Sequence, residues 1–355
     1  MQDLRSGLYF GVCSTIFVDC VFCWQLCILA YHKTFVFLSY IGATGNVPNF
    51  LEFYFDVDLK LHFQQKLQEL LPQALILPGI FADFGVIIEV SAFGGRLIWF
   101  ENGAPFIGEA IHDPKEIDSL KVPEAGLAGL MPLALTQREI MRRKLKSEGI
   151  EMEHWGFSMG PAEIAGLLMG YQNFYIGLFE DPVHIKKLME ITTELVIKWL
   201  HVQEKNFGGL DAMCIADHVC SQVRPDQLAE FIMPYEKAIF AEFPKAVKIY
   251  HNEVRHADKH IKMILEFGAD VWHFGSDQHD ISELYSVVGD EIVLFGGLDP
   301  HGVIRFAGPD EVRNETLKVI QASKNRRLLL STGTGTTPET TLENQRAMIE
   351  TVAKA

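Results

Sequence analysis

The sequence predicts an α/β protein with a (β/α)8 TIM barrel, a closed ring of parallel strands surrounded by helices. Three observations support this class. Short apolar runs alternate with longer amphipathic stretches from residue 34 onward, an order typical of parallel strands joined by helices. Eight such runs are present, which fits a closed barrel better than an open sheet. No linker interrupts the chain, so residues 1–355 are interpreted as a single barrel domain.

Each predicted strand is a short run rich in β-branched, aromatic or aliphatic residues. In chain order the runs are TFVFLSY (34–40), ALILPG (74–79), EHWGFS (153–158), AMCIAD (212–217), AVKIYHN (246–252), VWHFGS (271–276), IVLFGGLD (292–299) and RLLLSTG (327–333).

Two of the segments between these runs have a distinct pattern. Residues 182–209 carry apolar residues every three or four positions and end in two glycines, which predicts a long helix. Residues 85–105 read as two strands around Gly94 and Gly95, so we expect an extra hairpin after the second barrel strand.

Residues 1–33 differ in composition from the rest and form an extra N-terminal segment. They hold four of the six cysteines in apolar, aromatic surroundings, which favours buried reduced thiols over a metal or iron–sulfur cluster. The uncharged run 20–31 is too short to span a bilayer, and no cleavage site with a basic flank is evident. We therefore expect a cytoplasmic protein. The cysteines are Cys13, Cys20, Cys23 and Cys27.

The charge balance restricts the partners. A formal net charge of -15 and a pI near 5.3 argue against nucleic acid and against an anionic membrane, because both attract basic surfaces. A small anionic ligand is still compatible with this balance.

Polar residues follow most of the predicted strands. Active sites of such barrels lie at the carboxyl ends of the strands, so these positions are the candidate site. They are residues 42–46 (GATGN), Asp83, residues 158–160, Asp217 with His218, His251 to Glu253, Ser276 with Asp277, Gly297 with Asp299, and residues 332–335 (TGTG) with Thr334.

The stretch IYHNEVRHADKH (249–260) is the densest of these groups. Alternation along a strand places His251 and Glu253 on one side and Asn252 on the other. His256 and His260 lie one helical turn apart beyond the strand end and are interpreted as part of a solvated helix, without a ligand role.

From residue 42 onward the chain resembles the uroporphyrinogen decarboxylase superfamily, particularly its cobalamin-dependent methyltransferase branch. The matching stretches are LPGIFADFGVIIEVSAFGG, GFSMGPAEIAGLLMGYQNFYIGLFEDP, FIMPYEKAIF, FGGLDPHGVIRFAGPDEV and STGTGTTPETTLENQRAMI. The resemblance implies the same barrel.

The decarboxylase itself is the runner-up. It is similar in carrying an aspartate at the position of Asp83, but it binds an octacarboxylate through an arginine-rich N-terminal motif. Here the first hundred residues contain only Arg5 and Arg96, too few for such a substrate. His218 and Thr334 also stand where the decarboxylase carries a serine and a histidine.

The methyltransferases that use coenzyme M resemble the chain more closely. They hold zinc with a His-x-Cys pair and a later cysteine, which keeps the thiol substrate ionised. This chain has His251, but Glu253 and Thr334 replace the two cysteines. Two good ligands rarely hold zinc, so we expect no metal; if zinc is present, His251 and Glu253 are its ligands.

Without zinc, the resemblance implies tetrahydrofolate as the methyl acceptor or donor. Methyl transfer at N5 requires proton management, for which carboxylates and imidazoles are suited. The expected catalytic residues are His251, Glu253 and Asp83. Carboxylates such as Asp217 and Asp277 can also pair with the N–H edge of a pterin. The expected substrate-binding residues are Asn252, Asp217, His218, Ser276, Asp277, Gly297, Asp299 and Thr334.

The expected partner is a corrinoid protein. The chain lacks an Asp-x-His-x-x-Gly cobalamin-binding motif, so cobalamin must arrive on another protein that docks over the barrel mouth. A homodimer is also compatible with the resemblance.

Overall fold

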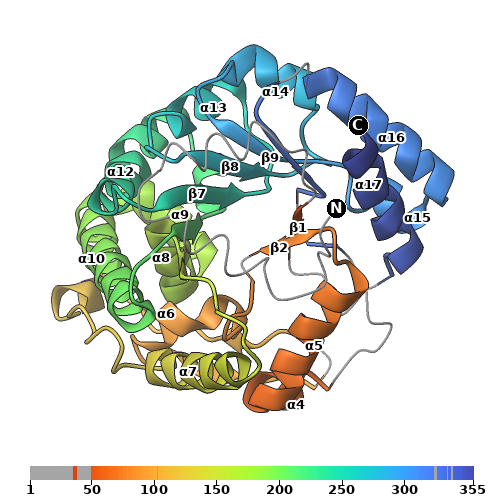
Figure 1. The fold of residues 1–355 in the computed structure, drawn as a ribbon. Helices are drawn as coiled ribbons and strands as arrows, with labels where there is room; N and C mark the ends of the chain where they lie inside the picture. Colours follow the sequence, from red (N-terminus) through yellow and green to blue (C-terminus); the bar gives the residue numbers. More distant parts are fainter. Residues whose placement is uncertain are drawn as a thin grey trace.

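A computed structural model describes residues 35–37, 49–77, 79–101, 103–323, 326–333, 335–336 and 339–355. Figure 1 shows the strands near the centre, ringed by helices. The segment 1–33 with its four cysteines, the loop 42–46 and Thr334 lie outside the described residues. Within the described part, no helix is both long and apolar enough to cross a membrane.

The strands confirm the predicted barrel. Each of the eight predicted runs contains one parallel strand, and the helices between them give the α/β alternation. The strands are β1 Phe35–Phe37, β2 Leu75–Leu77, β5 Trp155–Met159, β6 Ala212–Ala216, β7 Val247–Asn252, β8 Val271–Phe274, β9 Val293–Gly297 and β10 Leu328–Ser331.

Parallel pairing sets which strand ends lie together. Six strands form one ladder in the order β10-β9-β8-β7-β6-β5, and β1 pairs with β2. β1 lies beside β10. In the ladder His251 is opposite both Ala216 and His273. Because parallel strands end at the same edge, this register brings the polar ends of β6, β7 and β8 together.

The helices pack outside the strands. The predicted helix at 182–209 is α10, and it ends at Gly208, whose φ of 85° is the left-handed conformation that glycine adopts readily. The helices are α4 Phe50–Phe55, α5 Val57–Leu70, α6 Ile88–Ser91, α7 Met131–Ser147, α8 Pro161–Met169, α9 Tyr171–Glu180, α10 Pro182–Phe207, α11 Pro225–Gln227, α12 Met233–Glu242, α13 Asp258–Ile264, α14 Ile281–Val288, α15 Val303–Phe306, α16 Pro309–Ser323 and α17 Leu342–Lys354.

The predicted hairpin is displaced along the chain. Residues 85–91, expected as its first strand, form a helical turn and α6. The backbone N–H of Gly85 donates to the Asp83 carboxylate at 2.7 Å, and the helical turn buries Ile87 and Val90 on one face. The hairpin pairs β3 Leu97–Ile98 with β4 Phe106–Ile107 instead. Tertiary burial therefore overrides the β-propensity of the VII run.

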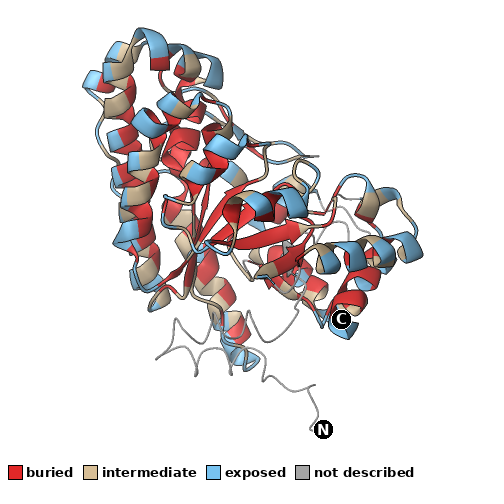
Figure 2. Ribbon diagram, turned by 90° about the horizontal axis from the view of Figure 1, so that it is seen from above, coloured by how far each residue is buried: buried red, intermediate tan, exposed pale blue. Residues whose placement is uncertain are grey.

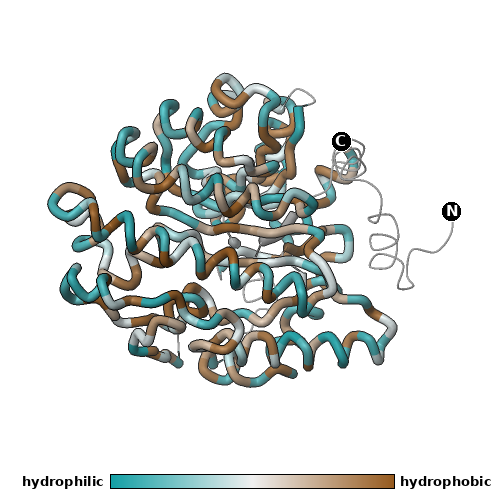
Figure 3. The backbone as a smooth tube through the Cα atoms, turned by 90° about the vertical axis from the view of Figure 1, so that its left-hand side faces the viewer, coloured by the Kyte–Doolittle hydropathy of each residue, from teal (hydrophilic) through white to brown (hydrophobic). Residues whose placement is uncertain are grey.

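Apolar side chains fill two layers. One lies inside the strands and includes Leu77, Cys214 and Phe295; the other lies between strands and helices and includes Ile215 and Leu294. Figure 2 shows the central strands buried and the helices exposed on their outer sides. The helices alternate between hydrophilic and hydrophobic positions along the tube in Figure 3, as expected for amphipathic helices that cover a sheet.

The barrel has a seam, which we define as the break in the ladder between β2 and β5. No ladder joins these neighbouring strands among the described residues. The carboxamide of Gln203 on α10 instead accepts from the Phe157 N–H and donates to the Phe157 carbonyl, both at 3.0 Å. Gln64 on α5 pairs in the same way with the backbone of Phe81, at 2.9 Å for each bond. The backbone N–H and C=O groups of Phe157 and Phe81 thus have hydrogen-bond partners, although no strand pairing closes the seam.

Replacing Gln203 with methionine should lower the free energy of unfolding by about 2–4 kcal/mol, because two backbone groups lose their partners. Urea unfolding followed by circular dichroism measures the change. Gln172→Met is the control, since Gln172 is exposed on α9. Equal stability of the two variants would contradict a structural role for the Gln203 carboxamide.

Candidate functional site

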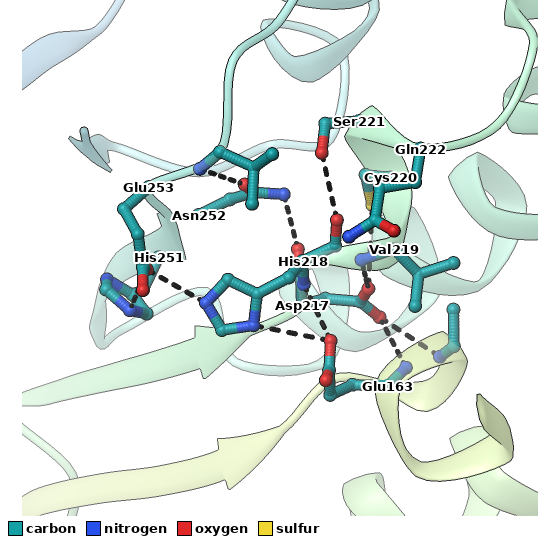
Figure 4. A network of polar contacts seen from close by, with 12 residues as sticks. Glu163, Asp217, His218, Val219, Cys220, Ser221, Gln222, His251, Asn252 and Glu253 are labelled. Atoms are coloured by element: carbon teal, nitrogen blue, oxygen red, sulfur yellow. Dashed lines mark hydrogen bonds and ion pairs between the residues drawn. The ribbon is translucent and has the colours of Figure 1, made fainter. Parts of the chain in front are cut away.

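The mouth of the barrel holds two imidazoles that share one carboxylate. Nε2 of His218, just after β6, lies 2.8 Å from Oε2 of Glu253. Nε2 of His251, on β7, lies 2.7 Å from the same oxygen. Figure 4 shows this arrangement. We call His218, His251 and Glu253 the triad; the sequence analysis placed all three in the site.

Each imidazole is also held on its other side. Nδ1 of His218 lies 3.3 Å from Oε2 of Glu163, in the first turn of α8, and Tyr171 donates to Glu163. Nδ1 of His251 lies 2.8 Å from Nδ1 of His273 on β8. Both rings are therefore fixed in orientation, as in sites where an imidazole must present one nitrogen.

Within the triad, His218 and Glu253 carry opposite charges. Burial opposes charge on His218, yet hydrogen bonds and the charges of Glu163 and Glu253 raise its pKa to about 10. Burial also opposes charge on Glu253, but the hydrogen bonds from His218 and His251 hold its pKa well below the usual range. At neutral pH the site thus contains an imidazolium and a carboxylate.

Sequence reasoning missed Glu163, Tyr171 and His273. Every residue of α8 is buried, and Glu163 is the one charged residue in its sequence PAEIAGLLM. A single carboxylate in an otherwise apolar helix is the signal that could have found it, because buried carboxylates require partners. His273 is likewise the one ionisable residue in the apolar run VWHF (271–274); for Tyr171 no comparable signal exists.

An aromatic cavity opens beside the triad. It measures about 1030 Å³ including the part open to solvent, and His218, His251 and Asp83 are among its lining residues. The Asp83 carboxylate accepts a hydrogen bond from the Gly85 N–H. The backbone carbonyl of Asp83 accepts one from the buried Lys60 ammonium at 2.6 Å. Lys60 also donates to Gln137 at 2.8 Å. These bonds fix the Asp83 loop at the cavity.

Asp217 and Asn252 were predicted to bind substrate, but the structure places them elsewhere. Both are fully buried and neither lines the cavity. The Asp217 carboxylate accepts from the N–H groups of Ala162 and Val219 at 3.0 and 3.1 Å, and Asn252 donates to the Asp217 carbonyl at 2.6 Å. The polar groups of both side chains form hydrogen bonds to the backbone at the strand ends.

The predicted site residues on the later strands also lie outside the cavity lining. Ser276 accepts from the Gly297 N–H at 2.6 Å, and a Cβ at Gly297 would lie 2.7 Å from Val319, so packing explains this glycine. Asp277 is exposed. Asp299 accepts from the N–H groups of two following residues at 2.8 and 2.9 Å, which closes a turn.

His256 and His260 are buried, contrary to the predicted solvated helix. They are 4% and 8% exposed. His260 Nε2 donates to the Val223 carbonyl at 2.8 Å. Both ring nitrogens of His256 lack a hydrogen-bond partner among the described residues, and its ring packs against Trp272 and His279. His256 lies in the loop before α13 and packs against Trp272 of β8, and His260 lies on α13; neither lines the cavity.

His256 should make the protein sensitive to acid. Burial and the nearby His279 lower its pKa to about 3, so below the unfolded pKa of about 6.5 the unfolded state binds the proton and stability falls. The loss is about 1.4 kcal/mol per pH unit between about 6.5 and 3. Urea unfolding at pH 7 and pH 4.5 should show a smaller difference for His256→Leu than for wild type. His112→Leu, at an exposed histidine, should keep the wild-type difference.

Comparison with known proteins gives the family. Residues 48–355 match the model of the family described as uroporphyrinogen decarboxylase (URO-D), and the chain belongs to this family of enzymes. Curated relatives include uroporphyrinogen decarboxylases from Rickettsia massiliae, 23% identical with 88% of each chain covered, and from Aquifex aeolicus, 23% identical with 88% of this chain and 89% of the relative covered.

Solved structures share the fold. A methyltransferase from Methanosarcina mazei superposes with a TM-score of 0.73 at 18% identity, covering 90% of this chain and 94% of the other. A B12-independent methionine synthase from Shewanella sp. W3-18-1 superposes with a TM-score of 0.52 at 11% identity, covering 84% and 87%. The predicted URO-D-like barrel is thereby confirmed.

Proposed function

We propose that this protein transfers a methyl group between a corrinoid protein and N5 of tetrahydrofolate, in a reaction that needs no zinc. The observation that carries the proposal is the triad beside an aromatic cavity. When N5 attacks the methyl carbon, the cobalt–carbon bond breaks with both electrons remaining on cobalt, and the proton on N5 must leave. Glu253 does not line the cavity itself, but it is the most exposed member of the triad, with a side chain 34% exposed. Because its pKa is lowered it stays ionised, and we assign it the role of accepting a hydrogen bond from the N5 N–H while the proton leaves to water.

The other residues have supporting roles in this proposal. Glu163 and Glu253 hold His218 as a cation, and the cation in turn keeps Glu253 ionised and oriented. Asp83, at the rim of aromatic side chains, offers a carboxylate to the N–H edge of a pterin. The corrinoid is carried by a partner protein, as the sequence resemblance implies.

A second candidate is metal-dependent methyl transfer to a thiol. Ligand atoms of His218, His251 and Glu253 lie within 4.8 Å of one another, so His218 supplies the third ligand that the sequence analysis did not assign. Both imidazoles are oriented by Glu163 and His273, which suits a metal site. The residues thus fit a divalent metal, which would ionise a thiol substrate.

Decarboxylation of uroporphyrinogen has less support from the cavity. Eight carboxylates require several cationic partners, whereas Arg138 is the one arginine or lysine among the described residues that line the cavity. Turnover of uroporphyrinogen by the purified protein would overturn the methyl-transfer proposal.

Isothermal titration with methyltetrahydrofolate tests the first proposal, using metal-stripped and zinc-loaded protein in parallel. We expect micromolar binding without zinc and at least a tenfold loss for Asp83→Ala, since one charge-assisted hydrogen bond contributes about 1.5–3 kcal/mol. Asp277→Ala is the control, because Asp277 is exposed outside the cavity. Stoichiometric zinc without folate binding would sink the folate proposal and favour the thiol reaction.

A further inference from the structure

Arg138 is a buried cation that lines the same cavity. It lies in the middle of α7 and is 7% exposed. Its guanidinium donates to the Glu153 carbonyl at 2.6 Å and lies 3.4 Å from the centroid of the Phe207 ring. It forms no ion pair with a carboxylate of the described residues, whereas Arg142, one turn further along α7, pairs with Glu139 at 2.7 Å.

The nearby acid is a weak counterion. Burial raises the pKa of Glu153 to about 7, so this carboxyl is only partly ionised at neutral pH. Burial lowers the pKa of Arg138 to about 10, which leaves the guanidinium charged. A buried charge without a full counterion is costly to the folded state. Such a group is explained when an anion from outside completes it.

The cavity around Arg138 is shaped for a flat ring. Aromatic side chains come from the strand β5, from the loop after β2 and from α10. The seam allows α7 and α10 to reach the cavity, and the carboxamide of Gln203 satisfies the backbone at this opening. Aromatic walls with a few charged groups, here Arg138 on α7 and Asp83 and His218 elsewhere in the lining, are typical of sites for small organic ligands. The aromatic lining residues include Phe81, Phe84, Trp155, Phe157, Trp199 and Phe207.

We infer that Arg138 is the carboxylate-binding residue of this cavity and that the ligand is an aromatic compound bearing a carboxylate. The planar guanidinium fork matches a carboxylate geometrically. Arg138 reaches the cavity from α7, outside the strands, whereas His218 and His251 reach it from the strand ends. Arg138 and the two histidines of the triad line the same cavity. The inference deepens the proposed function, because a folate carries both rings and carboxylates, but the subsite rests on Arg138 and the cavity alone.

Tryptophan fluorescence provides a direct readout, since Trp155 and Trp199 line the cavity. The probes are benzoate and benzamide, which share a ring and differ in charge. We expect wild-type protein to bind benzoate at least tenfold more tightly than benzamide. Equal binding of the two probes, or no binding of benzoate, would overturn the inference without any variant.

Two arginine variants locate the effect. Arg138→Gln should abolish the preference for benzoate, while Arg142→Gln should keep it, because Arg142 is half-buried and already paired with Glu139. Thermal melts establish that both variants are folded. A benzoate preference that persists in folded Arg138→Gln would overturn the assignment. If benzoate discrimination depends on Arg138 while methyltetrahydrofolate fails to bind, the folate proposal fails and the subsite stands.

Discussion

Replacing Glu253 with glutamine should reduce methyl transfer at least about 100-fold, because the variant loses the negative charge that the two imidazoles of the triad share. Glutamine preserves the shape of the side chain, but its amide is neutral, and its NH2 group cannot accept a hydrogen bond from His218 or His251. The rate of transfer between methylcobalamin and tetrahydrofolate, followed by cobalamin absorbance, measures the effect.

The same variant should change the protonation of His218. The charge of Glu253 contributes to the raised pKa of about 10, so the pKa should fall in Glu253→Gln, which NMR titration of the histidine ring detects. Because the folded pKa exceeds the unfolded value, the stabilisation is fully present below about pH 6.5 and is lost as pH rises through about 10. The variant should therefore show a weaker loss of stability at alkaline pH.

A control distinguishes loss of the Glu253 carboxylate within the triad from loss of a carboxylate elsewhere on the protein. Glu266→Gln removes an exposed carboxylate that pairs with Lys237 at 2.9 Å. It should leave methyl transfer and the His218 titration unchanged. Full activity of Glu253→Gln, with a normal His218 pKa, would exclude the triad from the chemistry.

The barrel could be predicted from sequence because its signals are local. Each strand is a short apolar run and each connection an amphipathic helix, so the order of elements is visible without tertiary contacts. The hairpin was misplaced because residues 85–91 have β-propensity but are buried as helix. Short segments of this kind take their conformation from packing, which the local pattern does not contain.

The site was predictable only where it lies on strand ends. His218 and Glu253 follow strands directly and His251 lies near the end of β7, and barrel geometry alone places such residues at the mouth. Glu163 and Arg138 come from helices, and only the folded chain brings them to the cavity. Asp217 and Asn252 satisfied the same strand-end rule, yet they bond to backbone. Sequence position indicates which residues reach the mouth, but not which backbone groups will need their side chains.

Gly333 provides the second large expected effect. In the sequence it belongs to TGTG (332–335), one of the candidate site positions at the strand ends. In the structure a Cβ at Gly333 would lie 2.3 Å from Oγ of Ser276 and 2.4 Å from the Phe274 carbonyl. Its φ is +72°. The glycine is therefore required by the packing of the chain after β10 against the end of β8, whether or not a ligand is bound.

Gly333→Ala should accordingly lower the free energy of unfolding by about 4 kcal/mol or more, the range of mutations that force backbone apart in a packed core. Gly149→Ala separates the cost of left-handed backbone from the cost of steric contact, because Gly149 has a φ of +79° but nothing within 4 Å of its Cβ position. That control should lose only about 1 kcal/mol, the cost of left-handed backbone for alanine. Urea unfolding of both variants measures the difference. Equal losses would mean that backbone conformation, and not contact with β8, makes glycine necessary at position 333.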